Sequence, residues 1–278
     1  MNTPKPLMHF TPAYFLNPVH PIKVTLIGAG GNGSQMLSAL ARIDYALRQL
    51  GKMGLEVTVW DPDTVEPSNV GRQLFSTADI GQNKADCLVS RFNRVYGNNW
   101  KAIPEEFRHT YPGNSFGNII ITCVDNKKVR MEIGKYFPIE KKKLAQNEYY
   151  PFYWLDLGNG QRTGQVILGS NPIDQPETEQ YQSVNRLPTL TDTYDLEQVD
   201  EKESGPSCSL AEALSKQDLF INSSLVQMAA SLLWSVFTDY GIEYQGFYMN
   251  LDTYRTIPIP VKKYKTPKPK AKTKKTEK

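Results

Sequence analysis

The residues of this chain that could do chemistry begin with a glycine-rich turn. Gly28, Gly30 and Gly33 follow the pattern GxGxxG and come directly after the apolar run IKVTLI at residues 22–27. From Ser34 onward, apolar residues recur at helical spacing. Glycines between a buried strand and a helix let the backbone approach a phosphate, and the helix N-terminus adds N–H donors and a partial positive charge. The turn therefore predicts a nucleotide site; its alternative is a tight strand-to-helix turn that binds nothing.

One acid and two cations follow in the next part of the chain. Asp61 ends the second apolar run, LEVTVW, where a carboxylate can accept hydrogen bonds from both hydroxyls of a ribose. NAD and ATP sites share that role, and its alternative is a surface acid that caps a turn. Arg72 and Lys84 distinguish the two nucleotides, because a site that expels pyrophosphate must stabilise the charge growing on the leaving phosphate. An NAD site relies mainly on backbone amides, so this pair predicts ATP.

The cysteines are three in number, Cys87, Cys123 and Cys208, and none forms a CxxC pair. They therefore predict neither a disulfide framework nor a four-thiolate zinc site, and no zinc is expected. Cys208 lies where a polar segment meets a helical one, and a helix N-terminus lowers the pKa of a thiol. It is a candidate acceptor of an acyl group as a thioester, with a small buried residue as the alternative. Cys87 and Cys123 lie among apolar residues and are expected to be unreactive.

The elements that must position these residues form a βαβ unit: strand, glycine turn, helix and strand. Its right-handed crossover places the helix N-terminus at the carboxyl edge of a parallel sheet. We expect further strands at residues 118–124, 153–157, 165–168 and 246–259, and helices at 34–50, 85–96 and 209–237. The last helix is expected to break near Asn222. The predicted fold class is α/β, a Rossmann-like sheet with helices on both faces.

The chain divides into three expected parts. Residues 1–21 form an extended, proline-rich lead-in, 22–261 form one α/β domain, and 262–278 form a disordered lysine-rich tail. Within the domain, residues 171–206 are polar and without periodicity, which predicts a long crossover loop that is mobile, functional or both.

Charge is distributed unevenly between the tail and the rest of the chain. The tail carries nine lysines and one glutamate, net +8 against +3 for the whole chain, which leaves −5 for residues 1–261. The tail is interpreted as a solubilising end, with an arm for nucleic acid or an acidic partner as the alternative. No apolar run approaches the roughly 20 residues that cross a bilayer, and the N-terminus does not resemble a signal peptide. We expect a cytoplasmic protein without a membrane partner.

These residues together resemble the ATP-site signature of the ThiF/MoeB/HesA proteins, the bacterial relatives of ubiquitin-activating enzymes. The matching motifs are DPDTV at 61–65, SNVGRQ at 68–73, GQNK at 81–84, CVDN at 123–126 and GQV at 164–166. The resemblance covers residues 22–240 and leaves the tail outside. The later pattern PSCSLAEALSKQDLFINSSL resembles the ThiF-family proteins of plasmid-borne PRTRC systems.

The resemblance implies an ATP-binding adenylation domain of the ubiquitin-activating type and a residue role for each motif. Asp61 would bind the ribose of ATP. The phosphates would be held by Asn69, Arg72 and Lys84, and the Mg²⁺ of Mg·ATP by Asp125. The implied reaction is attack by the C-terminal carboxylate of a small ubiquitin-like β-grasp protein on the α-phosphate, which gives an acyl-adenylate and pyrophosphate. Transfer to Cys208 would follow, and the resemblance also implies a homodimer.

Three departures from the family pattern keep other functions open. The zinc-binding CxxC pairs are absent, the segment between Asp125 and Cys208 is long, and no arginine precedes Arg42. Many family members supply an N-terminal arginine to the ATP site of the partner subunit. One alternative is therefore a catalytically impaired binding module for a β-grasp partner. An NAD-dependent oxidoreductase, supported only by the glycine turn and Asp61, is less favoured. A nucleic-acid protein is least favoured, because only the tail is basic.

Overall fold

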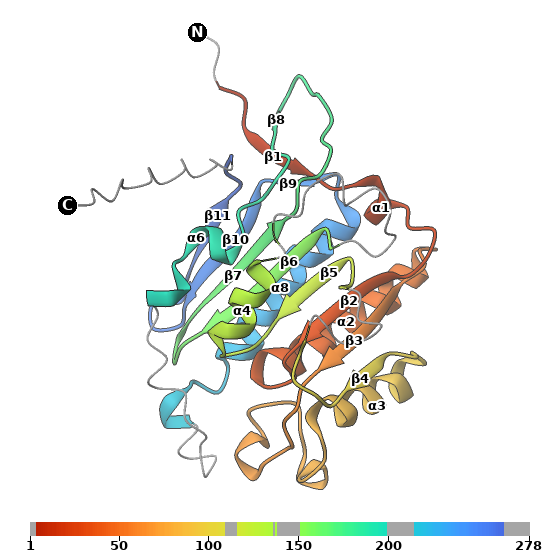
Figure 1. Ribbon diagram of the computed structural model, residues 1–278, viewed down its shortest axis with the longest axis vertical. Coiled ribbons are helices and arrows are strands. Elements are labelled where there is room, and N and C mark those ends of the chain that lie inside the picture. The colour runs from red at the N-terminus through yellow and green to blue at the C-terminus, as the bar shows by residue number, and fades with distance from the viewer. Residues whose placement is uncertain (1–3, 109–115, 136, 138–150, 199–213, 264–278) are drawn as a thin grey trace, which may run out of the picture.

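A mixed β-sheet forms the centre of the computed structural model, which describes residues 4–108, 116–135, 137, 151–198 and 214–263. The sheet has eight strands in the order β11-β10-β7-β6-β5-β2-β3-β4 (Figure 1). The parallel strands are β6 (Tyr153–Asn159), β5 (Ile119–Thr122), β2 (Ile22–Ile27), β3 (Leu55–Trp60) and β4 (Lys101–Ile103). The antiparallel strands are β7 (Thr163–Ser170), β10 (Tyr244–Asn250) and β11 (Arg255–Pro260).

The parallel half brings the chemistry-bearing segments to one edge of the sheet. β2 pairs in register with β3 from Ile22↔Leu55 to Ile27↔Trp60, and it pairs with β5 on its other side. Strands buried on both faces read as continuous apolar runs, which is why the expected bounds of β2 and β3 agree with the structure. Because these strands are parallel, the residues that follow them meet at their carboxyl ends.

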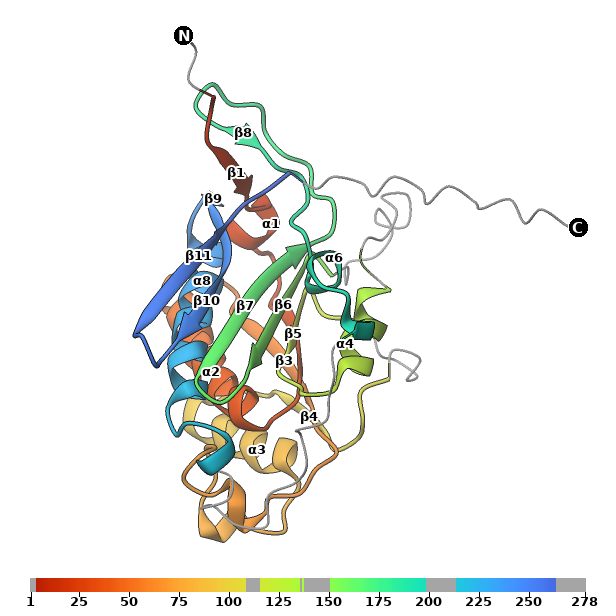
Figure 2. The ribbon, with the colours of Figure 1, turned by 90° about the vertical axis from the view of Figure 1, so that its left-hand side faces the viewer.

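Helices cover both faces of the sheet (Figure 2). On one face lie α2 (Gly31–Gln49), α3 (Lys84–Tyr96) and α8 (Ile221–Thr238), and on the other lie α4 (Lys127–Gly134) and α6 (Leu190–Thr193). The larger hydrophobic cluster joins the first three helices to the sheet, and a smaller cluster around Trp60 and Trp154 joins the other two. The predicted fold class, α/β with helices on both faces, is confirmed.

The N-terminal segment is folded rather than a simple extended lead-in. It contains β1 (Leu7–Phe10) and the one-turn helix α1 (Ala13–Leu16). β1 pairs in parallel with β8 (Gln182–Ser183) and antiparallel with β9 (Gly241–Ile242), which makes a second, three-stranded sheet. The elements are short and interrupted by prolines, so no period is long enough to reveal them in the sequence.

The expected crossover loop is also ordered over its described part, which ends at residue 198. Besides β8 and α6 it contains the 3₁₀ turn Leu196–Gln198, and Val184 and Leu187 are buried in the larger cluster. These anchors are isolated apolar residues in a polar sequence, which explains the absence of a periodic signal. The remainder of the loop and the tail from residue 264 lie outside the described residues.

The long helical stretch expected at residues 209–237 is interrupted, and residues 209–213 lie outside the described part of the chain. Residues 214–216 are helical, 217–220 are not, and α8 starts at Ile221, so the expected break near Asn222 agrees with the structure. Within the described residues, no helix combines the length and apolarity that a bilayer crossing requires.

Candidate active site

The glycine turn between β2 and α2 is closed tightly against the end of β5. Gly28 has φ +91°, and a Cβ there would lie 2.6 Å from the carbonyl oxygen of Cys123. A Cβ on Gly33 would lie 1.9 Å from the carbonyl oxygen of Gly28, so both positions require glycine. Gly30 caps α2 without a side-chain hydrogen bond. The first N–H groups of α2 are thus uncapped by that residue and available to an anion.

Asp61 is buried at the end of β3, beside this turn. Its Oδ2 accepts a hydrogen bond from the backbone N–H of Ala29 at 2.5 Å, and its Oδ1 accepts one from that of Asp63 at 2.9 Å. Burial raises the pKa of the carboxyl, while these two hydrogen bonds and the nearby charge of Lys84 oppose the rise. A carboxylate has about four acceptor positions, so capacity for ribose hydroxyls is left.

Lys84 is the first residue of α3 and is buried. Its Nζ lies 2.9 Å from Oδ2 of Asp63, whose side chain is mostly exposed. Asn83 caps the helix through its Oδ1 and donates its Nδ2 hydrogens to the carbonyl oxygens of Asp61 and Asp63. The local fold therefore fixes Lys84 next to Asp61, the candidate ribose-binding carboxylate. In this position the positive charge of Lys84 can contact a phosphate.

Asn69 has a different first task from the phosphate contact expected of it. It ends the 3₁₀ turn Pro67–Asn69, and its Oδ1 accepts a hydrogen bond from the backbone N–H of Glu66 at 2.8 Å. A second 3₁₀ turn, Thr77–Asp79, is capped in the same way by Ser76. The Oδ1 of Asn69 thus stabilises the loop, and the Nδ2 hydrogens of the same side chain are left to donate to a phosphate.

Arg72 lies in the loop between these turns and is half-buried. Its Nη1 donates a hydrogen bond to Oε1 of Gln217, and its Nε is buried without a partner among the described residues. Burial lowers the pKa of the guanidinium. The loop is tied to the glycine turn, because Ser34 Oγ accepts from the Leu74 N–H at 3.2 Å.

Two buried amides beside the turn were missed by the sequence analysis. Gln73 lies within 3.9 Å of a Cβ placed on Gly30, and its Oε1 has no partner in the described part of the chain. Asn32 donates from Nδ2 to Oδ1 of Asn159 at 2.8 Å, and its own Oδ1 is buried and equally unpartnered there. Their positions, inside the glycine motif and next to Arg72, were the only signal.

Asp125 lies just beyond β5 and is exposed, close to the glycine turn that contacts Cys123. The next residue, Asn126, caps α4 by accepting from the N–H of Lys128 at 2.7 Å. The described residues contain no group of three or more His, Cys, Asp or Glu that could hold a metal alone. A single carboxylate still suits Mg²⁺ brought in by a nucleotide, since that ion takes most of its ligands from phosphates and water.

The cysteines fall into two groups. Burial raises the pKa of the Cys87 thiol to about 11, and it raises the pKa of the Cys123 thiol as well. Both thiols stay protonated near neutral pH, which agrees with the expectation that they are unreactive. Cys208 lies outside the described residues, so its expected position at a helix start stays a prediction.

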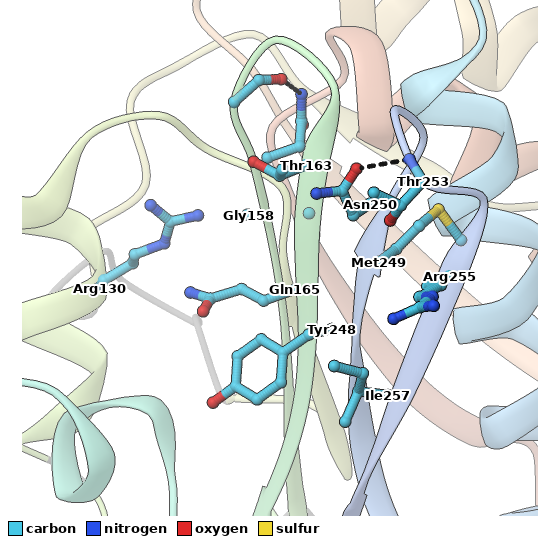
Figure 3. Close-up of a pocket in the computed structure, with 13 residues that line it drawn as sticks. Arg130, Gly158, Thr163, Gln165, Tyr248, Met249, Asn250, Thr253, Arg255 and Ile257 are labelled. Carbon is cyan, nitrogen blue, oxygen red and sulfur yellow. Dashed lines mark hydrogen bonds between the residues drawn. The ribbon is translucent and has the colours of Figure 1, made fainter.

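A cavity of about 670 Å³ opens on the antiparallel half of the sheet (Figure 3). Arg130, Gln165 and Tyr248 point into it from α4, β7 and β10. The complete lining is Arg130, Gly158, Asn159, Gly160, Thr163, Gly164, Gln165, Tyr248, Met249, Asn250, Thr253, Arg255 and Ile257. Its lining holds two arginines, of which Arg130 is paired with the buried Asp156 behind the lining, so Arg255 is the cation that favours a negatively charged occupant.

The cavity adjoins the glycine turn. Asn159, which lines it, is the hydrogen-bond partner of Asn32 in the first turn of α2. Arg130 is fixed by an ion pair with the buried Asp156, whose Oδ2 lies 2.8 Å from its Nε. A ligand extended along the cavity would therefore end next to the candidate nucleotide site.

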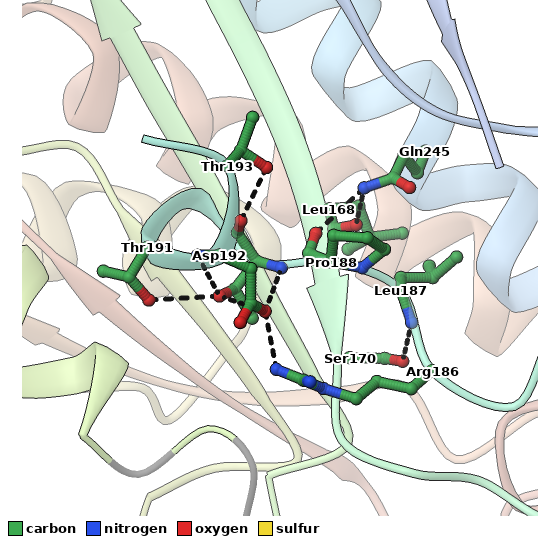
Figure 4. Close-up of polar contacts among 10 residues, drawn as sticks. Leu168, Ser170, Arg186, Leu187, Pro188, Thr191, Asp192, Thr193 and Gln245 are labelled. Atoms are coloured by element: carbon green, nitrogen blue, oxygen red, sulfur yellow. Dashed lines mark hydrogen bonds and ion pairs between the residues drawn. The ribbon is translucent and has the colours of Figure 1, made fainter. Parts of the chain in front are cut away.

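The segment before the 3₁₀ turn Leu196–Gln198 is held by polar contacts among its own residues and with β7 (Figure 4). Asp192 accepts from the N–H and Oγ1 of Thr189 and pairs with Arg186 at 2.5 Å. The hydroxyl of Tyr194, just beyond, lies 2.6 Å from that of Tyr248 in the cavity lining. Through this contact the expected loop reaches one residue of the cavity lining.

The mixed sheet and the turn at its carboxyl edge define a Rossmann-like nucleotide-binding fold. The chain matches the ThiF family over residues 8–275, and it belongs to that family. The match extends beyond the expected residues 22–240 at both ends, and it includes most of the basic tail, which was expected to lie outside.

Relatives of this chain include a ubiquitin-activating enzyme and an adenylyltransferase. Ubiquitin-activating enzyme E1 1 of Candida albicans (strain WO-1) is 25% identical over 207 residues, which are 71% of this chain and 17% of that protein. Adenylyltransferase and sulfurtransferase UBA4 of the same species is 30% identical over 124 residues, 40% of this chain and 24% of that protein. The chain thus spans a minor part of the length of these relatives.

Solved structures agree on the fold. E. coli MccB with MccA-N7isoASN has a TM-score of 0.56 at 15% identity, over 87% of this chain and 65% of that one. E. coli MccB with ATP has a TM-score of 0.52 at 12% identity, over 90% of this chain and 65% of that one. At these identities the likeness concerns the fold alone.

Proposed function

We propose that this protein adenylates the C-terminal carboxylate of a small ubiquitin-like β-grasp protein at the expense of ATP. The observation that carries the proposal is the placement of two cations, Arg72 and Lys84, with little exposure beside a glycine turn and a ribose-type acid. Such cations are matched to a triphosphate whose leaving group gains charge. Membership of the ThiF family and its named activating enzymes support the same reaction class.

Each side chain has a role in holding Mg·ATP. The turn and the first N–H groups of α2 bind phosphate, Asp61 accepts from the ribose hydroxyls, and Arg72 and Lys84 take the phosphate oxygens, with the amide of Asn69 in support. Asp125 would hold Mg²⁺, which when bound neutralises phosphate charge. The solved structure of E. coli MccB with ATP supports a nucleotide in this fold.

The cavity supplies the path for the substrate tail. The tail of the partner would enter this cavity, and its carboxylate would be attracted by the guanidinium of Arg255. One carboxylate oxygen then forms a bond to the α-phosphorus, and the bond to the bridging oxygen of the β-phosphate breaks. An acyl-adenylate forms and pyrophosphate leaves. The solved structure of E. coli MccB with MccA-N7isoASN supports a peptide ligand for this fold.

Cys208 completes the proposal as the acyl acceptor. Its thiolate would attack the acyl carbon, form a thioester and release AMP. The homodimer, the cytoplasmic location and the kinship to PRTRC proteins belong to the proposal on the strength of the sequence resemblance.

The test is partner-dependent exchange of labelled pyrophosphate into ATP, measured with small β-grasp proteins from the same genome. Exchange is expected with the correct partner and is lost in Arg72→Ala and Lys84→Ala. Cys208→Ala is expected to keep exchange and lose the thioester. If no β-grasp partner supports exchange although ATP binds, the binding-module alternative is correct; tight NADH binding without ATP binding would favour the oxidoreductase.

A further inference from the structure

Arg72, the arginine assigned to the triphosphate, has a hydrogen-bond partner far away in the sequence. The Nη1 of Arg72 donates to Oε1 of Gln217, in the short segment that precedes α8. We propose that Gln217 is a positioning residue of the triphosphate site, which holds one edge of the Arg72 guanidinium so that its other edge faces the phosphates. The inference deepens the proposed function and rests on it.

Gln217 also connects the arginine to the glycine turn. Its Oε1 lies 3.4 Å from Nδ2 of Asn222, which is almost completely buried in the first turn of α8. Asn222 packs directly on Gly31, where an added Cβ would lie 2.5 Å from the Asn222 Nδ2. Three side chains thus form a bridge from the loop of Arg72 to the phosphate-binding turn.

The segment that carries Gln217 is anchored independently of the arginine. The N–H of Asp218 donates to the carbonyl oxygen of Gln161 at 2.9 Å, and the Gln161 Nε2 donates to that of Ser215 at 3.0 Å. Arg162 pairs with Asp218 at 3.6 Å. Gln217 is therefore held in place by the β6–β7 hairpin and can orient Arg72 rather than merely follow it.

The donors of the arginine show what this contact leaves available. A guanidinium has five N–H donors in a rigid fork, and its Nε and one Nη form an edge that matches two phosphate oxygens. Gln217 takes Nη1, while Nε is buried and without a partner among the described residues. A buried donor in that condition gains most from an incoming acceptor. Because glutamine is neutral, the full positive charge of Arg72 is kept for the ligand.

The opposite role would be competition, in which Gln217 occupies Arg72 until a phosphate displaces it. The two roles predict opposite changes in the affinity for ATP when Gln217 is replaced. Removing a positioning residue weakens the binding of ATP, whereas removing a competitor strengthens it. AMP, which lacks the β- and γ-phosphates, reports on the ribose side of the site and should not respond in either case.

The experiment compares the dissociation constants of Mg·ATP and AMP by calorimetry for the full chain and its variants. Gln217→Met keeps the size of the side chain and removes the acceptor, and it should weaken ATP about tenfold while AMP is unchanged. Gln217→Glu should weaken ATP further, because its carboxylate pairs with Arg72 and competes with phosphate. The matched control is Gln227→Met, since Gln227 accepts from Arg42 at 2.8 Å on the exposed side of α8.

ATP affinity that is unchanged or raised in Gln217→Met overturns the inference, as does an equal loss of ATP and AMP binding, which would indicate general disruption. If Gln217→Met fails to fold, Gln217→Ala is measured in the same way. A wild-type chain that binds no ATP overturns the proposed function together with this inference. If the wild type binds ATP and the Gln217 variants bind it equally well, only this inference is overturned and the proposed function stands.

Discussion

His9 makes the stability of this protein depend on pH in a direction that can be worked out. It is completely buried in β1, with Nδ1 2.7 Å from the carbonyl oxygen of Val184 and Nε2 3.0 Å from the hydroxyl of Tyr153. The carbonyl can only accept, so Nδ1 carries the proton and Nε2 accepts from the tyrosine. A second proton would have to enter at Nε2 in an apolar environment, and burial lowers the pKa of His9 from 6.5 to about 4.

The folded pKa lies below the unfolded one, so the unfolded chain binds the proton first as the pH falls. Above pH 7 His9 is neutral in both the folded and the unfolded state, so it does not make the free energy of unfolding depend on pH. Between pH 6.5 and 4 the free energy of unfolding decreases, by about 2 kcal/mol at pH 5 and about 3 kcal/mol once both states are protonated. The loss should appear in the anchoring of β1, which joins the small sheet to the main one.

Urea unfolding followed by circular dichroism at pH 7, 6 and 5 measures this effect. His9→Asn keeps a donor near the Val184 carbonyl but cannot titrate, so it should be less stable at pH 7 and have a shallower pH dependence. His20→Asn, at a partly exposed position, is the matched control. The reasoning is refuted if His9→Asn and the wild type lose the same stability between pH 7 and pH 5.

The remaining predictions concern the site. Gly28→Ala should destabilise the fold by about 1–3 kcal/mol and weaken ATP binding, since a Cβ would clash with the Cys123 carbonyl; unchanged unfolding curves would contradict this. Asp125→Asn should raise the Mg²⁺ concentration needed for half-maximal pyrophosphate exchange, and an unchanged Mg²⁺ curve would remove its role. Arg255→Ala should raise the KM for the protein partner several-fold in a salt-dependent way, with the affinity for ATP unchanged; a loss of ATP affinity would show that the cavity does not serve the partner.

The sequence predicted the half of the fold that positions the nucleotide. β2 and β3 are buried on both faces, so their apolar runs are continuous and their ends are marked by Gly28 and Asp61. Gly28 and Asp61 were predicted for the same reason, because they follow those strands directly, whereas Arg72 and Lys84 were singled out by their charge. Functional residues that directly follow a strand can be predicted from the sequence without knowledge of distant contacts.

The features that the sequence did not predict depend on long-range packing. His9 anchors β1 through residues that lie far along the chain, and neither the period nor the composition of that segment indicates it. Gln217 is one polar residue in a polar stretch, and only the fold brings it to Arg72. The cavity likewise gathers side chains from α4, β6, β7, β10 and β11, which no linear motif unites.

The most direct test of the central claim is mass spectrometry of the intact protein mixed with Mg·ATP and each small β-grasp protein of the same genome. One partner should gain the mass of an AMP group at its C-terminal carboxylate, and it should then appear linked to Cys208 as a thiol-sensitive adduct. Arg72→Ala should abolish the first product, and Cys208→Ala only the second. A set of partners that all stay unmodified, although the protein binds ATP, would contradict the claim that it is an adenylating enzyme.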